Sequence, residues 1–186
     1  MTVKLGNTIP SDRNAALHLL QLLCADADLA ADPSGEVRPR NPEFCGRARE
    51  DQPACRCICD AIAAPRTITI VIREDLESFG GGRTDDDVPD DTSNGKGSDE
   101  TVNVEKRNRW HVRDSQGNWI DDPDWVILGH ELCGHAVAGA LGKHPEWRPT
   151  KKGYDPNWHA RAFETEDAIR KAAGLPELGE HSPSLK

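Results

Sequence analysis

Two histidines, His130 and His135, stand five residues apart within one apolar segment of the chain. A helix is expected there, because Asp122 or Asp124 can act as its N-cap and places acidic charge at its positive end. The apolar residues continue to about Gly142, where we expect this helix to end.

The five-residue spacing is incompatible with a regular helix that aims both imidazole rings at one point. Each residue of an α-helix turns by about 100°, so a residue five positions on lies about 140° away. One extra residue accommodated as a π-bulge would restore the alignment. Gly134 lowers the cost of such a distortion, and the spacing therefore predicts a bulged helix.

The residues of this segment fit the chemistry of a hydrolytic zinc site. Such a site needs imidazoles to hold the ion, an open coordination position, and a carboxylate that takes a proton from water. The common arrangement is H-E-x-x-H, whereas this chain has H-E-x-x-x-H with Glu131 directly after the first histidine. We therefore expect His130 and His135 to bind Zn²⁺ and Glu131 to act as the general base.

The string His-Glu-Leu-Cys-Gly-His at 130–135 resembles the H-E-x-x-G-H motif of the dipeptidyl peptidase III family. In that family the longer spacing still binds zinc, and the glutamate is the catalytic base. The wider run 126–139 resembles the active-site helix of zincin metallopeptidases. These resemblances, which cover six residues and one helix, imply an α+β, zincin-like fold. It would pack a small β-sheet with an active-site helix and a closing C-terminal helix.

A second helix is predicted from Asp155, an N-cap followed by Pro156, to about Ala173. With the Gly-Leu-Pro after it, this stretch resembles the C-terminal helix of bacterial effector and toxin metallopeptidases. Their pattern is roughly N-E-x-x-A-V-x-x-E-N-x-I-R followed by G-L-P. Setting Glu166 on the second glutamate of that pattern places His159 where the family has a glutamate ligand. The resemblance thus implies His159 as the third metal ligand.

Helical geometry agrees with this placement, because His159 and Glu166 are seven residues apart and share a face to within about 20°. Glu166 could ligate the ion itself or hold a ligand histidine from behind. His144 and Glu164 are further candidates for the third ligand, and a site without a third protein ligand also stays open. Tyr154, the only tyrosine, is a candidate donor to the oxyanion of a transition state.

The remaining elements are predicted from capping, proline and β-branched patterns. Ser11 is the expected N-cap of a helix that runs to about Ala31. One domain is expected over 1–186, with 1–64 as a possible subregion. We also expect a loop at 32–53, a short helix up to Ala64, and strands at 67–72, 101–104, 109–112 and 118–120.

Residues 79–100 are acidic and glycine-rich and have no apolar periodicity, so a mobile loop is expected. A calcium loop is the alternative, although the acidic residues lack the regular spacing of such a loop. They are Asp85, Asp86, Asp87, Asp90 and Asp91.

Five of the six cysteines crowd the first third of the chain, and Cys133 lies within the histidine motif. Disulfides from Cys24 and Cys45 into the cluster of Cys55, Cys57 and Cys59 are one expectation, with one thiol of the five left over. Reduced thiols are one alternative. A second metal site is another, although the alternating spacing of Cys55, Cys57 and Cys59 is not the C-x₂-C pattern of structural zinc sites. Cys133 itself is expected to be a buried structural thiol, with a role as an extra metal ligand as the alternative.

The net charge of −9 argues against nucleic acid as a partner, because a phosphate backbone would be repelled. No run of 18 apolar residues is present, so no membrane span is expected. The first ten residues lack the apolar core of a Sec signal peptide. We therefore expect a cytoplasmic protein or one exported by a signal-independent injection system. A delivery apparatus or an immunity protein would be a partner in the second case, and the sequence identifies neither.

Taken together, these features predict a zinc metallopeptidase that acts on a protein or peptide, and the resemblance of the C-terminal helix suggests a bacterial effector or toxin. One rival is a structural zinc module whose fourth ligand is Cys133 or His144, which would leave no position for water. A second rival is a zinc amidase acting on cell-wall peptides, which shares the chemistry and differs in substrate.

Overall fold

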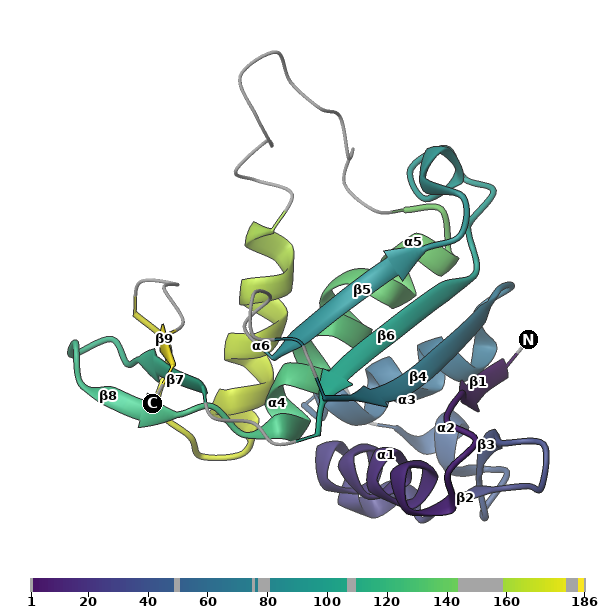
Figure 1. The fold of residues 1–186 in the computed structure, drawn as a ribbon, viewed down its shortest axis with the longest axis horizontal. Coiled ribbons are helices and arrows are strands. Elements are labelled where there is room, and N and C mark those ends of the chain that lie inside the picture. The colour runs from purple at the N-terminus through teal and green to yellow at the C-terminus, as the bar shows by residue number, and fades with distance from the viewer. Residues whose placement is uncertain are drawn as a thin grey trace.

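The computed structural model describes residues 2–48, 51–74, 76, 81–106, 110–143, 159–179 and 184–185. Within them a six-stranded sheet, a three-stranded sheet and several helices combine, so the expected α+β class is confirmed. The smaller sheet is set apart from the larger one, beyond helix α6 (Ala160–Ala172) (Figure 1).

The larger sheet contains β1 (Thr2–Leu5), β2 (Leu29–Ala31), β3 (Glu36–Pro39), β4 (Thr67–Arg73), β5 (Gly82–Asp86) and β6 (Glu100–Glu105). Their order across the sheet is β2-β3-β1-β4-β6-β5. The pairs β1–β4 and β4–β6 are parallel, whereas β5 runs antiparallel to β6. Strand β5 is therefore an edge strand.

The β-branched run at 67–72 forms β4, as predicted. Its side chains alternate between the two faces of the sheet, and Ile68, Ile70 and Ile72 are buried on one face. This face packs against the helices in a single apolar cluster that also includes Leu20 and Leu128.

The helices are α1 (Pro10–Leu23), α2 (Phe44–Arg47), α3 (Pro53–Ala63), α4 (Asp124–Gly129), a π-helix (His130–Ala136), α5 (Val137–Ala140) and α6. Short 3₁₀ turns lie at Ala25–Ala27 and Pro89–Asp91. Residues of α1, α3 and the π-helix share the core with the sheet, so both halves of the chain contribute to it. Among the described residues, no helix is both long enough and apolar enough to span a membrane.

Several predictions for the first fifty residues are wrong. Ile9, not Ser11, is the N-cap of α1, because Pro10 occupies the first turn, where its missing N–H costs nothing. The helix ends at Leu23, and Leu29–Ala31 pairs with β3 as a strand. The expected loop at 32–53 contains β3 and α2, and β1 was not predicted.

The loop predicted over 79–100 is corrected at Gly82–Asp86, which form β5. Backbone pairing with β6 makes this strand, in the register Thr84 to Val102. An edge strand can be polar, because pairing uses main-chain groups and one side faces solvent. Hydrophobic periodicity could not reveal it.

The smaller sheet has the order β8-β7-β9 and consists of β7 (Trp110–Arg113), β8 (Trp119–Asp121) and β9 (Ser184–Leu185). The strands expected near 101–104, 109–112 and 118–120 correspond to β6, β7 and β8 and are confirmed within the described residues.

All six cysteines lie among the described residues, and they form three disulfides with no free thiol. Cys24 bonds to Cys55 and Cys45 bonds to Cys59, which confirms the expected disulfides from Cys24 and Cys45 into the cysteine cluster. The expected leftover thiol is wrong, since Cys57 bonds to Cys133. Cys133 is therefore not a buried free thiol, because it faces α3 and ties that helix to the histidine motif.

Candidate metal centre

The histidine motif lies on a helix that changes its hydrogen-bond pattern in the middle. Between α4 and α5, residues His130–Ala136 form a π-helix, and the N–H of Val137 donates to the carbonyl of Leu132, five residues back. The predicted π distortion is confirmed and extends over the whole motif. Pro123 is the N-cap of α4, so the expected cap at Asp122 or Asp124 is wrong.

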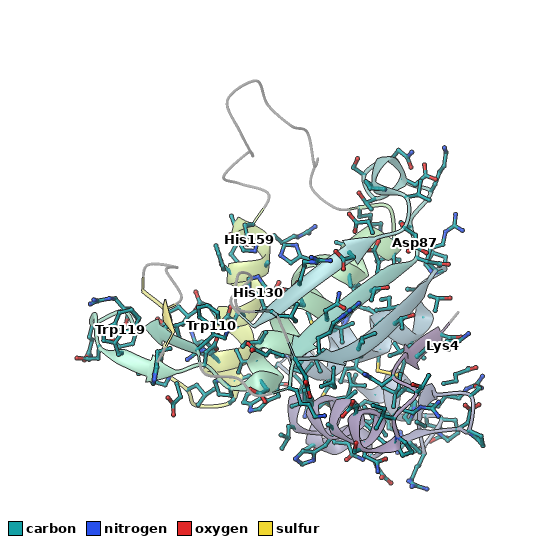
Figure 2. All side chains as sticks on the ribbon, viewed as in Figure 1. Lys4, Asp87, Trp110, Trp119, His130 and His159 are labelled. Carbon is teal, nitrogen blue, oxygen red and sulfur yellow. A yellow bond between two sulfur atoms is a disulfide. The ribbon has the colours of Figure 1, made fainter. Side chains whose placement is uncertain are left out.

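The π-helix brings the two motif histidines together with the predicted third one. His130, His135 and His159 each place one ring nitrogen so that the three nitrogens lie within 4.8 Å of one another. His159 is the N-cap residue of α6, and Nε2 of His130 lies 3.1 Å from its Nε2. Figure 2 shows His130 and His159 side by side near one end of α6.

Glu166 supports this cluster from behind. Its Oε2 lies 2.8 Å from Nδ1 of His130, on the far side of the ring from His159. Neither Glu166 nor the exposed Glu164 belongs to the three-histidine group. A carboxylate at Nδ1 fixes the tautomer and ring orientation and leaves Nε2 with its lone pair.

Arg170 anchors the supporting carboxylate. This guanidinium is 1% exposed, and its Nη1 lies 2.9 Å from Oδ1 of Asp122 and 3.4 Å from Oε1 of Glu166. Its Nε donates to the carbonyl of Pro176. The series of contacts from Asp122 through Arg170 and Glu166 to His130 therefore joins the residues just before α4 to α6.

Burial makes the negative charge of these carboxylates unfavourable unless a positive charge lies beside them. Burial and the charge of Glu166 raise the pKa of Asp122 to about 7, against the opposing effect of Arg170. Burial also lowers the pKa of His130, but the hydrogen bond to Glu166 and the charge of Glu131 outweigh it and the pKa is raised. A cation among these groups is favoured.

Glu131 is 8% exposed and is contacted by the edge strand β5. Oγ1 of Thr84 donates to its Oε2 at 2.8 Å and lies 3.2 Å from its main-chain oxygen. Burial raises the pKa of this carboxyl, and the charge of His130 and the Thr84 hydrogen bond act in the opposite direction. A buried carboxyl with a raised pKa is suited to accept and return a proton.

Gly134 allows the two helices to approach. A Cβ at this position would lie 2.5 Å from Cβ and 2.6 Å from Cα of Ala162 in α6. Any side chain at 134 would therefore push α6, and with it His159, away from the π-helix.

The three imidazoles could hold a metal ion, and zinc is one of the ions that such ligands suit. Two nitrogens bound tetrahedrally at about 2.0–2.1 Å would be about 3.3 Å apart, close to the 3.1 Å between the His130 and His159 nitrogens. Imidazole is a preferred zinc ligand, and the Glu166 contact is the kind of support that zinc-bound histidines receive.

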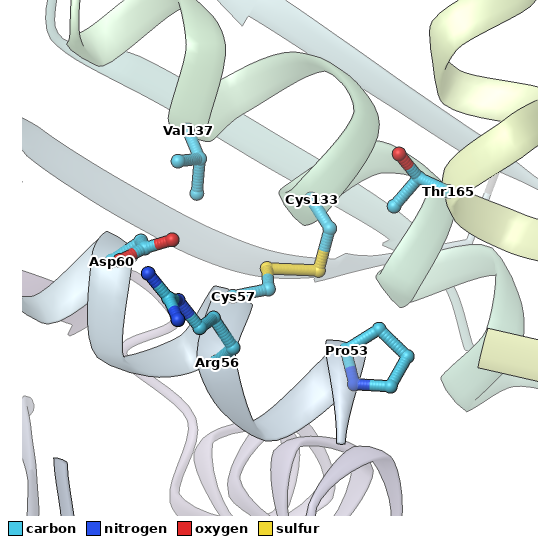
Figure 3. A pocket seen from close by; sticks show the side chains of 7 residues that line it. All are labelled: Pro53, Arg56, Cys57, Asp60, Cys133, Val137 and Thr165. Atoms are coloured by element: carbon cyan, nitrogen blue, oxygen red, sulfur yellow. A yellow bond between two sulfur atoms is a disulfide. The ribbon is translucent and has the colours of Figure 1, made fainter. Parts of the chain in front are cut away.

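The Cys57–Cys133 disulfide lies beside a surface hollow of about 480 Å³ (Figure 3). Cys133 stands between the two motif histidines and joins the π-helix to α3, so it has no thiolate to offer a metal. The other residues that line the hollow are Pro53, Arg56, Asp60, Val137 and Thr165.

Two candidates from the sequence, His144 and Tyr154, lie outside the described residues. Sequence reasoning assigned no role to Thr84 and did not foresee that Asp122 pairs with Arg170. Thr84 lies in a segment that was predicted to be a loop, and no sequence pattern there indicated its contact with Glu131. The sequence did indicate a partner for Arg170, because this residue follows Glu166 by four positions, a spacing typical of helical ion pairs.

Comparison of the chain with protein-family models, with curated proteins and with solved structures finds no match. What the centre does has to be inferred from its own residues.

Proposed function

We propose that this chain is a zinc-dependent metallopeptidase with a zincin-like arrangement. The observation that carries the proposal is the convergence of His130, His135 and His159, together with the buried carboxyl of Glu131, whose charge acts on His130. Three imidazoles and one adjacent carboxylate that is not a ligand form the minimal set for metal-assisted hydrolysis.

In this proposal His130, His135 and His159 hold the ion, and Glu166 keeps His130 oriented. Zinc held there would supply a Lewis acid that polarises a peptide carbonyl and makes water acidic enough to react at neutral pH. Glu131 takes the proton of the attacking water and passes it to the leaving amine.

The position of β5 supports a peptide as the substrate. This strand is the edge of the larger sheet, and its Thr84 touches Glu131. An extended peptide can add to a sheet edge through main-chain hydrogen bonds. No described strand pairs with the outer side of β5, and a peptide that pairs there would pass beside Glu131, which favours cleavage within an extended segment. A cell-wall peptide that can extend in the same way would be accepted too, so the amidase alternative stays open.

A closed structural zinc site is the rival function. Cys133 and His144 were its candidate fourth ligands. A cysteine bonded to Cys57 does not supply a thiolate, and His144 lies outside the described residues. Among the described residues, the potential metal group holds three ligands and no fourth. This favours an open coordination position and hence catalysis.

The three disulfides favour work in an oxidising compartment, where such bonds persist. This supports the proposal that the protein acts outside a reducing cytoplasm. A cytoplasmic role would require the three bonds to survive thiol reductants.

The proposed function is tested with the oxidised, zinc-loaded protein and an unfolded general protein substrate. Wild type should cleave it, whereas Glu131→Gln should bind one zinc per chain and lose at least about a thousandfold in rate. Glu164→Gln, an exposed change on α6, should keep full activity. Activity in Glu131→Gln equal to wild type would rule out Glu131 as the base, and a wild type that binds zinc yet cleaves no peptide would favour the structural module.

A further inference from the structure

Strand β5 contacts Glu131 at two alternate positions of the same strand face. At Gly82, an added Cβ would lie 2.8 Å from Cγ and 3.1 Å from Oε1 of Glu131, so only glycine leaves room for this side chain. At Thr84, two residues on, the hydroxyl donates to Oε2 at 2.8 Å. Residues two apart in a strand point to one side. On this side of β5, Gly82 leaves space for the Glu131 side chain, and Thr84 donates a hydrogen bond to it.

We propose that Thr84 is a positioning residue for the general base and that the strand that receives the substrate also orients Glu131. This inference rests on the proposed function. The Thr84 hydroxyl holds one carboxylate oxygen, Oε2. No hydrogen bond to Oε1 occurs among the described residues, so that oxygen stays available to accept the proton of water.

A structural role in the strand does not require the hydroxyl. Thr84 pairs with Val102 through main-chain groups, and valine has the same shape and a high strand propensity. The hydroxyl adds only the contact with Glu131. A hydrogen bond to a carboxylate is stronger than a neutral one, and it restricts rotation of a group that would otherwise adopt several orientations.

Loss of this orientation should affect the chemical step and not substrate binding. A displacement of about 1 Å in a reacting group can cost up to about a hundredfold in rate. Thr84→Val should therefore lower kcat by about ten- to a hundredfold and leave KM and zinc affinity within about twofold of wild type.

The experiment compares kcat, KM and zinc affinity of Thr84→Val, Thr84→Ser and Thr101→Val with wild type. Thr101 is the control, since it lies on the neighbouring strand β6, opposite Asp85. Thr84→Ser keeps the hydroxyl and should recover most of kcat, and Thr101→Val should match wild type.

Two results would overturn the positioning role. One is a kcat of Thr84→Val within twofold of wild type. The other is a joint loss of zinc affinity or thermal stability in both Thr84 variants, which would make the residue structural. A wild type that binds zinc and cleaves no peptide would remove the proposed function and this inference together, whereas an active wild type with an unaffected Thr84→Val removes the inference alone.

Discussion

Nδ1 of His130 lies 2.8 Å from Oε2 of Glu166, and this contact joins the π-helix to α6 across 36 residues of sequence. The first helix contributes His130 and His135, while the second contributes His159 and the carboxylate that orients His130. The candidate metal centre therefore depends on the interface between two helices, and we expect any change that loosens this interface to weaken metal binding.

Removal of the supporting carboxylate should lower zinc affinity. Glu166→Ala leaves the His130 ring without its acceptor, and loss of such a partner typically costs ten- to a hundredfold in metal affinity. Glu164→Ala, on the exposed side of the same helix, should have no effect. Competition with a chromophoric zinc chelator measures both. Equal affinities of the two variants would refute the supporting role of Glu166.

A methyl group at position 134 should separate the helices. Gly134→Ala gains about 1 kcal/mol of helix propensity, but its Cβ would lie 2.6 Å from the Cα of Ala162, a main-chain atom that cannot turn aside. Overpacking of this kind costs about 1–3 kcal/mol. We expect a lower melting temperature and weaker zinc binding, because α6 carries His159. Gly46→Ala, which meets no atom within 4 Å, is the control and should not be destabilised.

Loss of the Cys57–Cys133 disulfide should affect the metal centre more than loss of another disulfide. Double alanine replacement of either Cys57 and Cys133 or Cys45 and Cys59 should cost about 2–4 kcal/mol of stability. Only the first pair touches the π-helix, so only that variant should also lose zinc affinity. Metal titrations of both variants at a temperature where each is folded decide this. Equal zinc affinities would show that α3 does not hold the motif in place.

Glu100 should make stability fall as pH rises. Its carboxylate is 2% exposed and lies against Gly139, and neither oxygen accepts a hydrogen bond from a donor among the described residues. Burial, reinforced by the neighbouring carboxylate of Asp86, raises its pKa from 4.5 to about 11. Between these values the folded chain holds a proton that the unfolded chain releases, so the free energy of unfolding decreases with pH.

Glu100→Gln removes this penalty and keeps the shape of the side chain. We expect it to raise stability at pH 7 by about 1–3 kcal/mol, with the gain vanishing near pH 4, where both states of the wild type are largely protonated. Urea unfolding at the two pH values measures the difference. A gain of the same size at both would mean that the protonation of Glu100 is not its cause.

The histidine spacing carried enough information to predict the distorted helix, because 3.6 residues per turn leave no other way for His130 and His135 to meet. His159 came from a resemblance between helices and joins the same cluster. The β-branched run of β4 was equally direct, since its alternation appears in the residues themselves.

What escaped prediction depends on partners distant in sequence. Strand β5 exists because β6 offers it main-chain groups, and its residues Gly82 and Thr84 become meaningful only beside Glu131. The bond of Cys57 to Cys133 follows from the packing of α3 against the π-helix, which spacing in the sequence does not encode.

X-ray absorption at the zinc edge of the oxidised, zinc-loaded protein probes the ligands themselves. We predict three imidazole nitrogens at about 2.0–2.1 Å and a light non-protein ligand in the remaining position, with one imidazole lost in each of the His130→Ala, His135→Ala and His159→Ala variants. A spectrum with sulfur ligands, or one with three imidazoles that is unchanged in His159→Ala, would contradict a zinc centre built on these two helices.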